Sequence, residues 1–141
     1  AGAQHGWLRT PRLQFVCANA LEYPLPESDA FILNDILHYM SYEHQRTLLL
    51  RCMERLRPEG KLIVRDGNAA NTRKHRLTRF TELLSTGIFS FNKTTEQLCF
   101  TSEAQIRNIA QEGRMQLEIL PNDRYTSNTI YIFQKNKPEH E

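Results

Sequence analysis

Two short apolar runs on either side of one amphipathic stretch constrain the fold of this chain more than any other feature. Residues Ala30–Leu33 are all apolar and lie between Asp29 and Asn34, as is typical of a strand buried on both faces. A second strand is predicted over Lys61–Arg65, with Leu62–Val64 at its centre. Between them, residues at helical spacing form one apolar stripe, made of Leu48, Leu49, Cys52, Met53 and Leu56. A strand, a crossover helix and a strand predict one parallel, right-handed βαβ unit.

Polar residues and glycines mark the ends of the predicted helices. Ser41 is suited to cap the first helix, and Arg57–Gly60 turns the chain after it. Ser102, with Gln105 three residues later, forms a capping box for a later helix. Gly113 is expected at the C′ position that ends this later helix. These residues therefore predict the bounds of two helices.

Further elements complete the predicted order. Leu13–Cys17 is predicted as a short strand and Thr72–Leu84 as a helix, while Met115–Ile119 and Ile130–Phe133 are predicted to pair as an antiparallel hairpin. The predicted fold class is therefore α/β, with a mostly parallel sheet, a C-terminal antiparallel hairpin and helices on both faces. We expect residues 1–12 to be a lead-in, residues 13–135 to form the domain and residues 136–141 to be a disordered tail.

The composition argues against several classes of protein. The chain has 141 residues, and its net charge of +2 is too small to indicate a nucleic-acid partner. Its three cysteines include no CxxC pair, which argues against a disulfide framework and favours a reducing, cytoplasmic setting, with Cys17 and Cys52 in the core. No apolar run approaches the roughly 20 residues that span a bilayer. The histidines and cysteines match no metal-binding spacing, so no metal site is predicted.

Four stretches of the chain carry a resemblance to a known family. They are Phe15–Ala20, Asp29–Met40, Leu56–Val64 and Ser102–Gln134. In this order they resemble the third strand, the fourth strand with its loop, the turn into the fifth strand, and the closing helix and hairpin of class I S-adenosylmethionine-dependent methyltransferases. The resemblance implies the C-terminal half of a Rossmann-like methyltransferase sheet.

One departure from the family pattern concerns the glycines. Family members carry a glycine-rich turn near their N-terminus, where the backbone approaches the cofactor closely because glycine has no Cβ. The six glycines here form no such cluster; they are Gly2, Gly6, Gly60, Gly67, Gly87 and Gly113. We therefore expect the chain alone to bind S-adenosylmethionine weakly or not at all, and to show no turnover by itself.

The resemblance implies a cofactor site at two places. Asn19 would accept a hydrogen bond from the adenine amino group, and the Ala20 backbone N–H would meet a ring nitrogen. The alternative for Asn19 is a loop residue that satisfies a turn. Asn34 and Asp35 follow a central strand and would lie near the methionine end of the cofactor. The alternative for this pair is an ordinary polar strand end.

The resemblance also implies a substrate side. His38, followed by Tyr39 in the same loop, is the candidate catalytic residue, because a histidine can accept a proton from an oxygen or nitrogen acceptor. A surface histidine, or one bonded to the backbone, is the alternative. Asp66 and Asn68 end the next strand and are candidates for lining the substrate.

The leading hypothesis is methyl transfer to a small-molecule or lipid-like acceptor by the parent protein, for which the resemblance also permits a larger, membrane-associated chain. The alternative is a non-catalytic association module. Without the first family strands, Phe31–Leu33 would be a bare sheet edge, so we expect either a homodimer through that edge or the Leu13 strand beside it. Nucleic-acid binding ranks third, because a basic stretch over Arg73–Arg79 stands alone against the small net charge.

Overall fold

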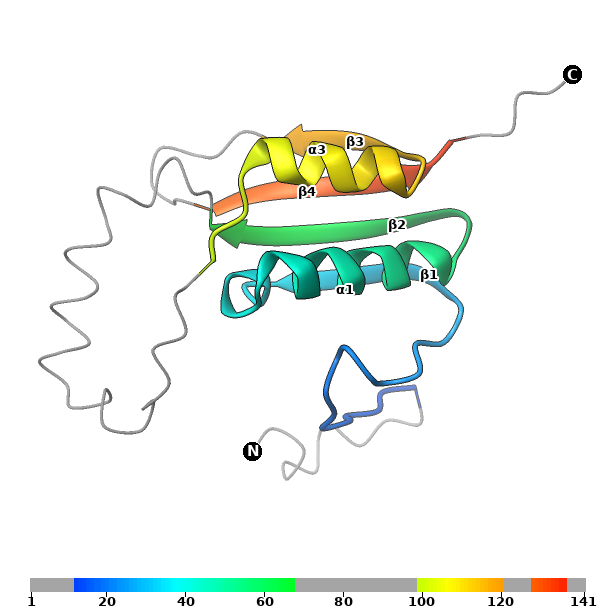
Figure 1. Cartoon of the computed structure of the whole chain (residues 1–141). Coiled ribbons are helices and arrows are strands. Elements are labelled where there is room, and N and C mark those ends of the chain that lie inside the picture. The colour runs from blue at the N-terminus through cyan, green and yellow to red at the C-terminus, as the bar shows by residue number, and fades with distance from the viewer. Residues whose placement is uncertain (1–11, 68–98, 121–127, 137–141) are drawn as a thin grey trace, which may run out of the picture.

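Four strands form one mixed sheet in the computed structural model, which describes residues 12–67, 99–120 and 128–136 (Figure 1). The strands are β1 (Ser28–Asn34), β2 (Leu56–Gly67), β3 (Met115–Leu120) and β4 (Asn128–Lys135). The helices are the 3-10 helix η3 (Leu37–Tyr39), α1 (Tyr42–Glu54) and α3 (Glu103–Glu112). The strand order is β1-β2-β4-β3, in which β1 and β2 are parallel while β4 runs antiparallel to both of its neighbours.

The predicted βαβ unit and the C-terminal hairpin are both confirmed. β1, α1 and β2 follow one another, and β1 pairs parallel with β2 over a register in which Ile32 faces Ile63. β3 and β4 pair antiparallel, as their alternating apolar residues predict. The chain is therefore an α/β protein whose described sheet matches the closing half of the predicted fold.

The helices α1 and α3 lie against the same face of the sheet, in front of the strands in Figure 1. Leu62 and Val64 of β2 and their partners Phe133 and Tyr131 of β4 point into this layer and are at most 1% exposed. They meet the apolar stripes of the two helices, whose innermost residues are Leu48, Leu49, Cys52, Ile106 and Ile109. Burial of these stripes is the main driving force that holds the layers together.

The opposite face of the sheet carries a row of isoleucines. Ile32, Ile63 and Ile132 are aligned across β1, β2 and β4, and Ile32 is 69% exposed. No described helix covers this face, although the sequence predicts helices on both faces. The helix predicted over Thr72–Leu84 lies outside the described residues, as do most of the predicted lead-in and tail.

The strand predicted over Leu13–Cys17 is wrong. These residues are exposed and have no ladder partner among the described strands. Cys17 is exposed and is therefore not a core thiol. A strand exists only where a neighbour takes up its backbone N–H and C=O groups, and the outer edge of β1 receives no described strand. As a result only one of the three described pairings is parallel, fewer than the mostly parallel sheet that the sequence predicts.

The helix starts follow the predicted caps, whereas the predicted ends need two corrections. α1 already ends at Glu54, and Leu56–Gly60, predicted as the end of the helical stripe and a turn, instead begin β2, because Leu56 pairs with Ser28 of β1. Ser41 accepts a hydrogen bond from the His44 N–H, and Ser102 forms the predicted capping box with Gln105. Gly113, however, is the C-cap with φ of −77°, and the left-handed residue is Arg114 with φ of 53°. A Cβ on Gly113 would lie 2.4 Å from the Met53 sulfur, so glycine is needed there for the close approach of α3 to α1.

Candidate active site

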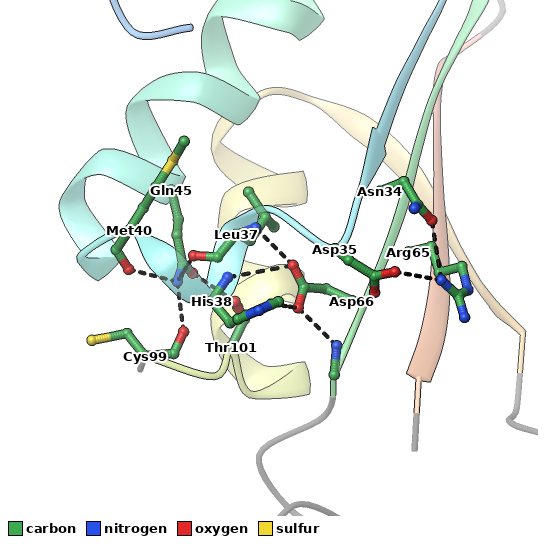
Figure 2. A network of polar contacts seen from close by, with 11 residues as sticks. Asn34, Asp35, Leu37, His38, Met40, Gln45, Arg65, Asp66, Cys99 and Thr101 are labelled. Atoms are coloured by element: carbon green, nitrogen blue, oxygen red, sulfur yellow. Dashed lines mark hydrogen bonds and ion pairs between the residues drawn. The ribbon is translucent and has the colours of Figure 1, made fainter. Parts of the chain in front are cut away.

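A histidine and a buried aspartate meet at the carboxyl ends of β1 and β2 (Figure 2). The His38 Nδ1 lies 2.6 Å from Oδ1 of Asp66, a residue that is 2% exposed. A carboxylate only accepts hydrogen bonds, so Nδ1 is the donor in this contact, and in the neutral imidazole Nε2 then keeps its lone pair. This is the geometry of an oriented general base.

Backbone N–H groups fix the Asp66 carboxylate in place. Oδ2 accepts hydrogen bonds from the Leu37 N–H at 2.7 Å and from the His38 N–H at 3.4 Å, and Oδ1 accepts one from the Gly67 N–H at 2.8 Å. These bonds satisfy both oxygens of a side chain that is otherwise removed from water. Asp66 therefore orients both the ring and the backbone of His38.

A buried glutamine joins the His38 loop, residues 35–41, to the segment before α3. The Gln45 side chain is 1% exposed, and its Nε2 donates to the Leu37 carbonyl at 2.9 Å and the Cys99 carbonyl at 2.8 Å. The Met40 carbonyl lies 3.1 Å from the same nitrogen. The Thr101 hydroxyl donates to Gln45 Oε1 at 2.6 Å, so every polar atom of the amide is used.

The segment before α3 also touches His38 directly. The Cys99 N–H donates to the His38 carbonyl at 3.0 Å, and the Phe100 ring stacks on the imidazole with centroids 5.4 Å apart. The Tyr39 ring also lies against the imidazole, with centroids 4.1 Å apart, and Tyr39 is 66% exposed. The imidazole therefore contacts two aromatic rings, of which that of Tyr39 is exposed.

Asn34 and Asp35 form a second polar group, on Arg65 of β2. The Arg65 Nη1 lies 2.6 Å from Oδ2 of Asp35 and 3.2 Å from Oδ1 of Asn34 (Figure 2). Asp35 adopts φ of 53°, a left-handed conformation that costs energy for a residue with a Cβ, and its N–H donates to the Arg65 carbonyl at 2.8 Å. This strained turn at the end of β1 separates two polar groups, the one around Arg65 and the one around His38.

Asn19 and Ala20 lie in a turn that precedes β1. Asn19 Oδ1 accepts from the Leu21 N–H at 3.1 Å, and the Asn19 carbonyl accepts from the Glu22 and Tyr23 N–H groups. The turn is the structure that the sequence analysis names as the alternative for Asn19. No hydrogen bond within the described residues links this turn to His38 or to Asn34. Asn68, the remaining candidate, lies outside the described residues.

The structure thus gathers His38, Tyr39 and Asp66 in one site, and adds residues that the sequence analysis misses. Gln45 could have been found, because a polar residue at the apolar positions of an amphipathic helix must be bonded in the core. Arg65 and Phe100 carry no comparable pattern. Among the described residues, no three His, Cys, Asp or Glu side chains form a group that could hold a metal ion. None of the described helices is long and apolar enough to cross a membrane.

The family model for the O-methyltransferase domain matches residues 3–109. The chain belongs to the O-methyltransferase domain family. This membership confirms the resemblance to class I methyltransferases. A search of curated proteins finds no match.

Solved structures of methyltransferases share the fold. An O-methyltransferase family protein from Burkholderia thailandensis is 20% identical, with a TM-score of 0.64. The match covers 91% of this chain and 37% of the Burkholderia protein. Human N-acetylserotonin methyltransferase in complex with SAM is 17% identical with a TM-score of 0.59, covering 85% and 33%. Magnesium protoporphyrin IX methyltransferase from Synechocystis with bound SAH is 13% identical with a TM-score of 0.58, covering 84% and 49%. The chain therefore spans between a third and a half of these proteins.

Proposed function

We propose that the protein carrying this chain transfers a methyl group from S-adenosylmethionine to an oxygen or nitrogen of a small-molecule or lipid-like acceptor, with His38 as the general base. The observation that carries the proposal is the 2.6 Å contact between His38 Nδ1 and the buried Asp66, at the strand ends of an O-methyltransferase family fold. Ligands of open α/β sheets bind at the carboxyl ends of the strands, which is where this pair lies.

The described residues fit the two ends of the cofactor. Asn19 Oδ1 uses one lone pair in its turn, so a second lone pair is left to accept from the adenine amino group. Asn34 and Asp35 would hold the methionine end, where Asp35 offers a carboxylate to the ammonium group. When bound, the cofactor supplies an electrophilic methyl group on a positively charged sulfur. Because the sequence has no glycine cluster, weak binding by this chain alone is part of the proposal.

His38 performs the acid–base work in this proposal. Its Nε2 accepts the proton of the acceptor hydroxyl or amine as the acceptor lone pair attacks, and Asp66 stabilises the imidazolium that results. Asp66 is too buried to line the substrate, so its proposed role changes to orienting His38. Tyr39 is exposed beside the imidazole and is proposed to contact the acceptor. Phe100 excludes water from one side of the ring.

The test of this proposal has two parts. In the first part, the protein that carries this chain is titrated with S-adenosylhomocysteine and binding is followed by calorimetry. The amide chemical shifts of Asn19, Ala20, Asn34 and Asp35 should change as the ligand binds. In the protein that carries this chain, His38→Gln should lower kcat by about 10²–10⁴-fold. The matched control is His44→Gln, because His44 is exposed at the start of α1 and its ring has no contact within the described residues. Equal loss of kcat in both variants, or no loss in His38→Gln, would reject His38 as the base.

The uncovered edge of β1 favours a second candidate role in association. β1 pairs only with β2 among the described strands, and Ile32 on it is 69% exposed. The prediction of a rearranged sheet, with the Leu13 strand beside β1, is wrong. The alternative prediction, a homodimer through this edge, is therefore kept as a proposal. Ile32→Lys should then convert the dimer into a monomer in light scattering. A wild-type chain that is monomeric at every concentration would contradict the proposal.

A cytoplasmic location is proposed from the cysteines. Cys17 is an exposed free thiol and Cys52 is a buried one, which suits a reducing setting.

A further inference from the structure

One arginine on α1 forms hydrogen bonds with the turn that precedes β1. The guanidinium of Arg51 donates from Nη1 to the Ala20 carbonyl at 2.9 Å and also to the Leu21 carbonyl, and from Nη2 to the Tyr23 carbonyl at 2.6 Å. These three carbonyls lie 28 to 31 residues earlier in the chain. We call residues 19–23 the adenine-side loop. Apart from its own turn, no described backbone group bonds to this loop.

The guanidinium suits this task in a way that no other side chain does. It is planar and presents five N–H donors in a rigid fork, so one residue can satisfy three carbonyls that point the same way. Partly buried carbonyls without a donor would cost free energy, and the loop has no strand partner to supply one. A lysine has the same charge, but its single nitrogen cannot span the three acceptors.

The contact reaches Asn19 through one peptide group. The peptide between Ala20 and Leu21 is planar, so its C=O and N–H point in opposite directions. Arg51 holds the oxygen of this peptide, while its N–H donates to Asn19 Oδ1 at 3.1 Å. Arg51 and the Asn19 side chain therefore bond to opposite sides of the same peptide group.

We infer that Arg51 is a positioning residue, which fixes the adenine-side loop so that Asn19 and the Ala20 N–H present their polar groups to adenine. This inference rests on the proposed function, since it needs a methyltransferase that binds S-adenosylmethionine at this loop. Arg51 acts on the affinity for the cofactor and not on the methyl transfer step, because its side-chain hydrogen bonds all go to the adenine-side loop and none goes to His38 or Asp66.

The test compares Arg51→Gln, Arg51→Lys and the control Arg55→Gln. Arg55 caps the same helix, is exposed, and its side chain has no contact within the described residues, so its loss removes the same charge without touching the loop. In the protein that carries this chain, Arg51→Gln should raise KM for S-adenosylmethionine about tenfold and leave kcat at saturating cofactor within about twofold. Arg51→Lys should give a smaller rise, and Arg55→Gln none.

Amide hydrogen exchange supplies a readout that needs no cofactor. The Leu21, Glu22 and Tyr23 amides should exchange about tenfold faster in Arg51→Gln, while the Leu62 and Val64 amides of β2 keep their protection. Unchanged loop exchange overturns the inference whatever the kinetics show, and so does a loosened loop with unchanged KM. If Arg51→Gln fails to fold, Arg51→Lys decides by the same two readouts. Failure of the unsubstituted protein to bind S-adenosylhomocysteine overturns the proposed function first, and this inference with it.

Discussion

The two loops of the candidate site are held in opposite ways. The His38 loop is fixed from inside the core, by Asp66 at 2% exposure and Gln45 at 1% exposure. The adenine-side loop is held by hydrogen bonds from the partly exposed Arg51 and by Ala20 and Leu21, which are only partly buried against the core. Buried polar networks are rigid when every member is satisfied and costly when one is missing. The proposed base, His38, is therefore fixed by buried hydrogen bonds, whereas the adenine-side loop is held at the surface of the core.

This difference predicts how each loop responds to substitution. Damage to the His38 loop should lower stability and activity together, because the same buried bonds serve both. Damage to the adenine-side loop should change ligand affinity with little effect on the global fold, because few core contacts depend on it. The following predictions test this contrast, from the largest expected effect to the smallest.

The largest effect is expected from Gln45→Leu. Leucine fits the apolar stripe of α1 but removes the hydrogen bonds that Gln45 makes to the Thr101 hydroxyl and to the Leu37 and Met40 carbonyls. Each buried polar group that loses its partner costs about 1–3 kcal/mol, so we expect the free energy of unfolding in urea to fall by about 3 kcal/mol. The control is Gln111→Leu on the exposed face of α3, with an expected change within about 0.5 kcal/mol. Similar stability of the two variants would refute the account of the His38 loop.

A smaller loss of stability but a clear loss of rate is expected from Asp66→Asn. The amide keeps the shape of the carboxylate but can donate to Nδ1, which would move the ring proton to Nε2 and block the base. We expect kcat to fall about 10²-fold or more in the protein that carries this chain, with KM for the cofactor unchanged. Asp29→Asn is the matched control, because the Asp29 side chain is 82% exposed and, within the described part of the chain, forms its one ion pair with Arg57. A rise in KM with an unchanged kcat would assign Asp66 to binding instead.

The sequence predicts the parts of this fold whose cause is local. Ala30–Leu33 and the stripe of α1 are apolar at the spacing of their element, and Ser102 caps its helix through a residue three positions away. Leu13–Cys17 has the same strand-like composition, but a strand also needs a partner, which composition does not reveal. The need for glycine at position 113 is equally hidden from the local sequence, because it comes from the Met53 side chain on another helix.

The site follows the same rule at longer range. His38 and Asp66 are both named by the sequence analysis, yet their contact follows only from the parallel register that sets Asn34 beside Arg65. Gln45 is visible as a polar residue in an apolar stripe. Arg51 is not visible, because nothing in its own helix indicates that three carbonyls of the adenine-side loop converge on it.

The smallest effect is expected from thiol labelling, which probes both regions without a substitution. Burial raises the pKa of Cys52 to about 11, whereas Cys17, just before the adenine-side loop, is exposed. At pH 8 only about one Cys52 in a thousand is then a thiolate, so iodoacetamide should modify Cys17 and spare Cys52 in mass spectra. Labelling of Cys52 should rise as the pH approaches 11, because deprotonation produces the reactive form, and both cysteines should react in denaturant. Equal rates in the folded chain at pH 8 would mean that α1 opens as readily as the adenine-side loop, and the contrast between the two loops would not hold.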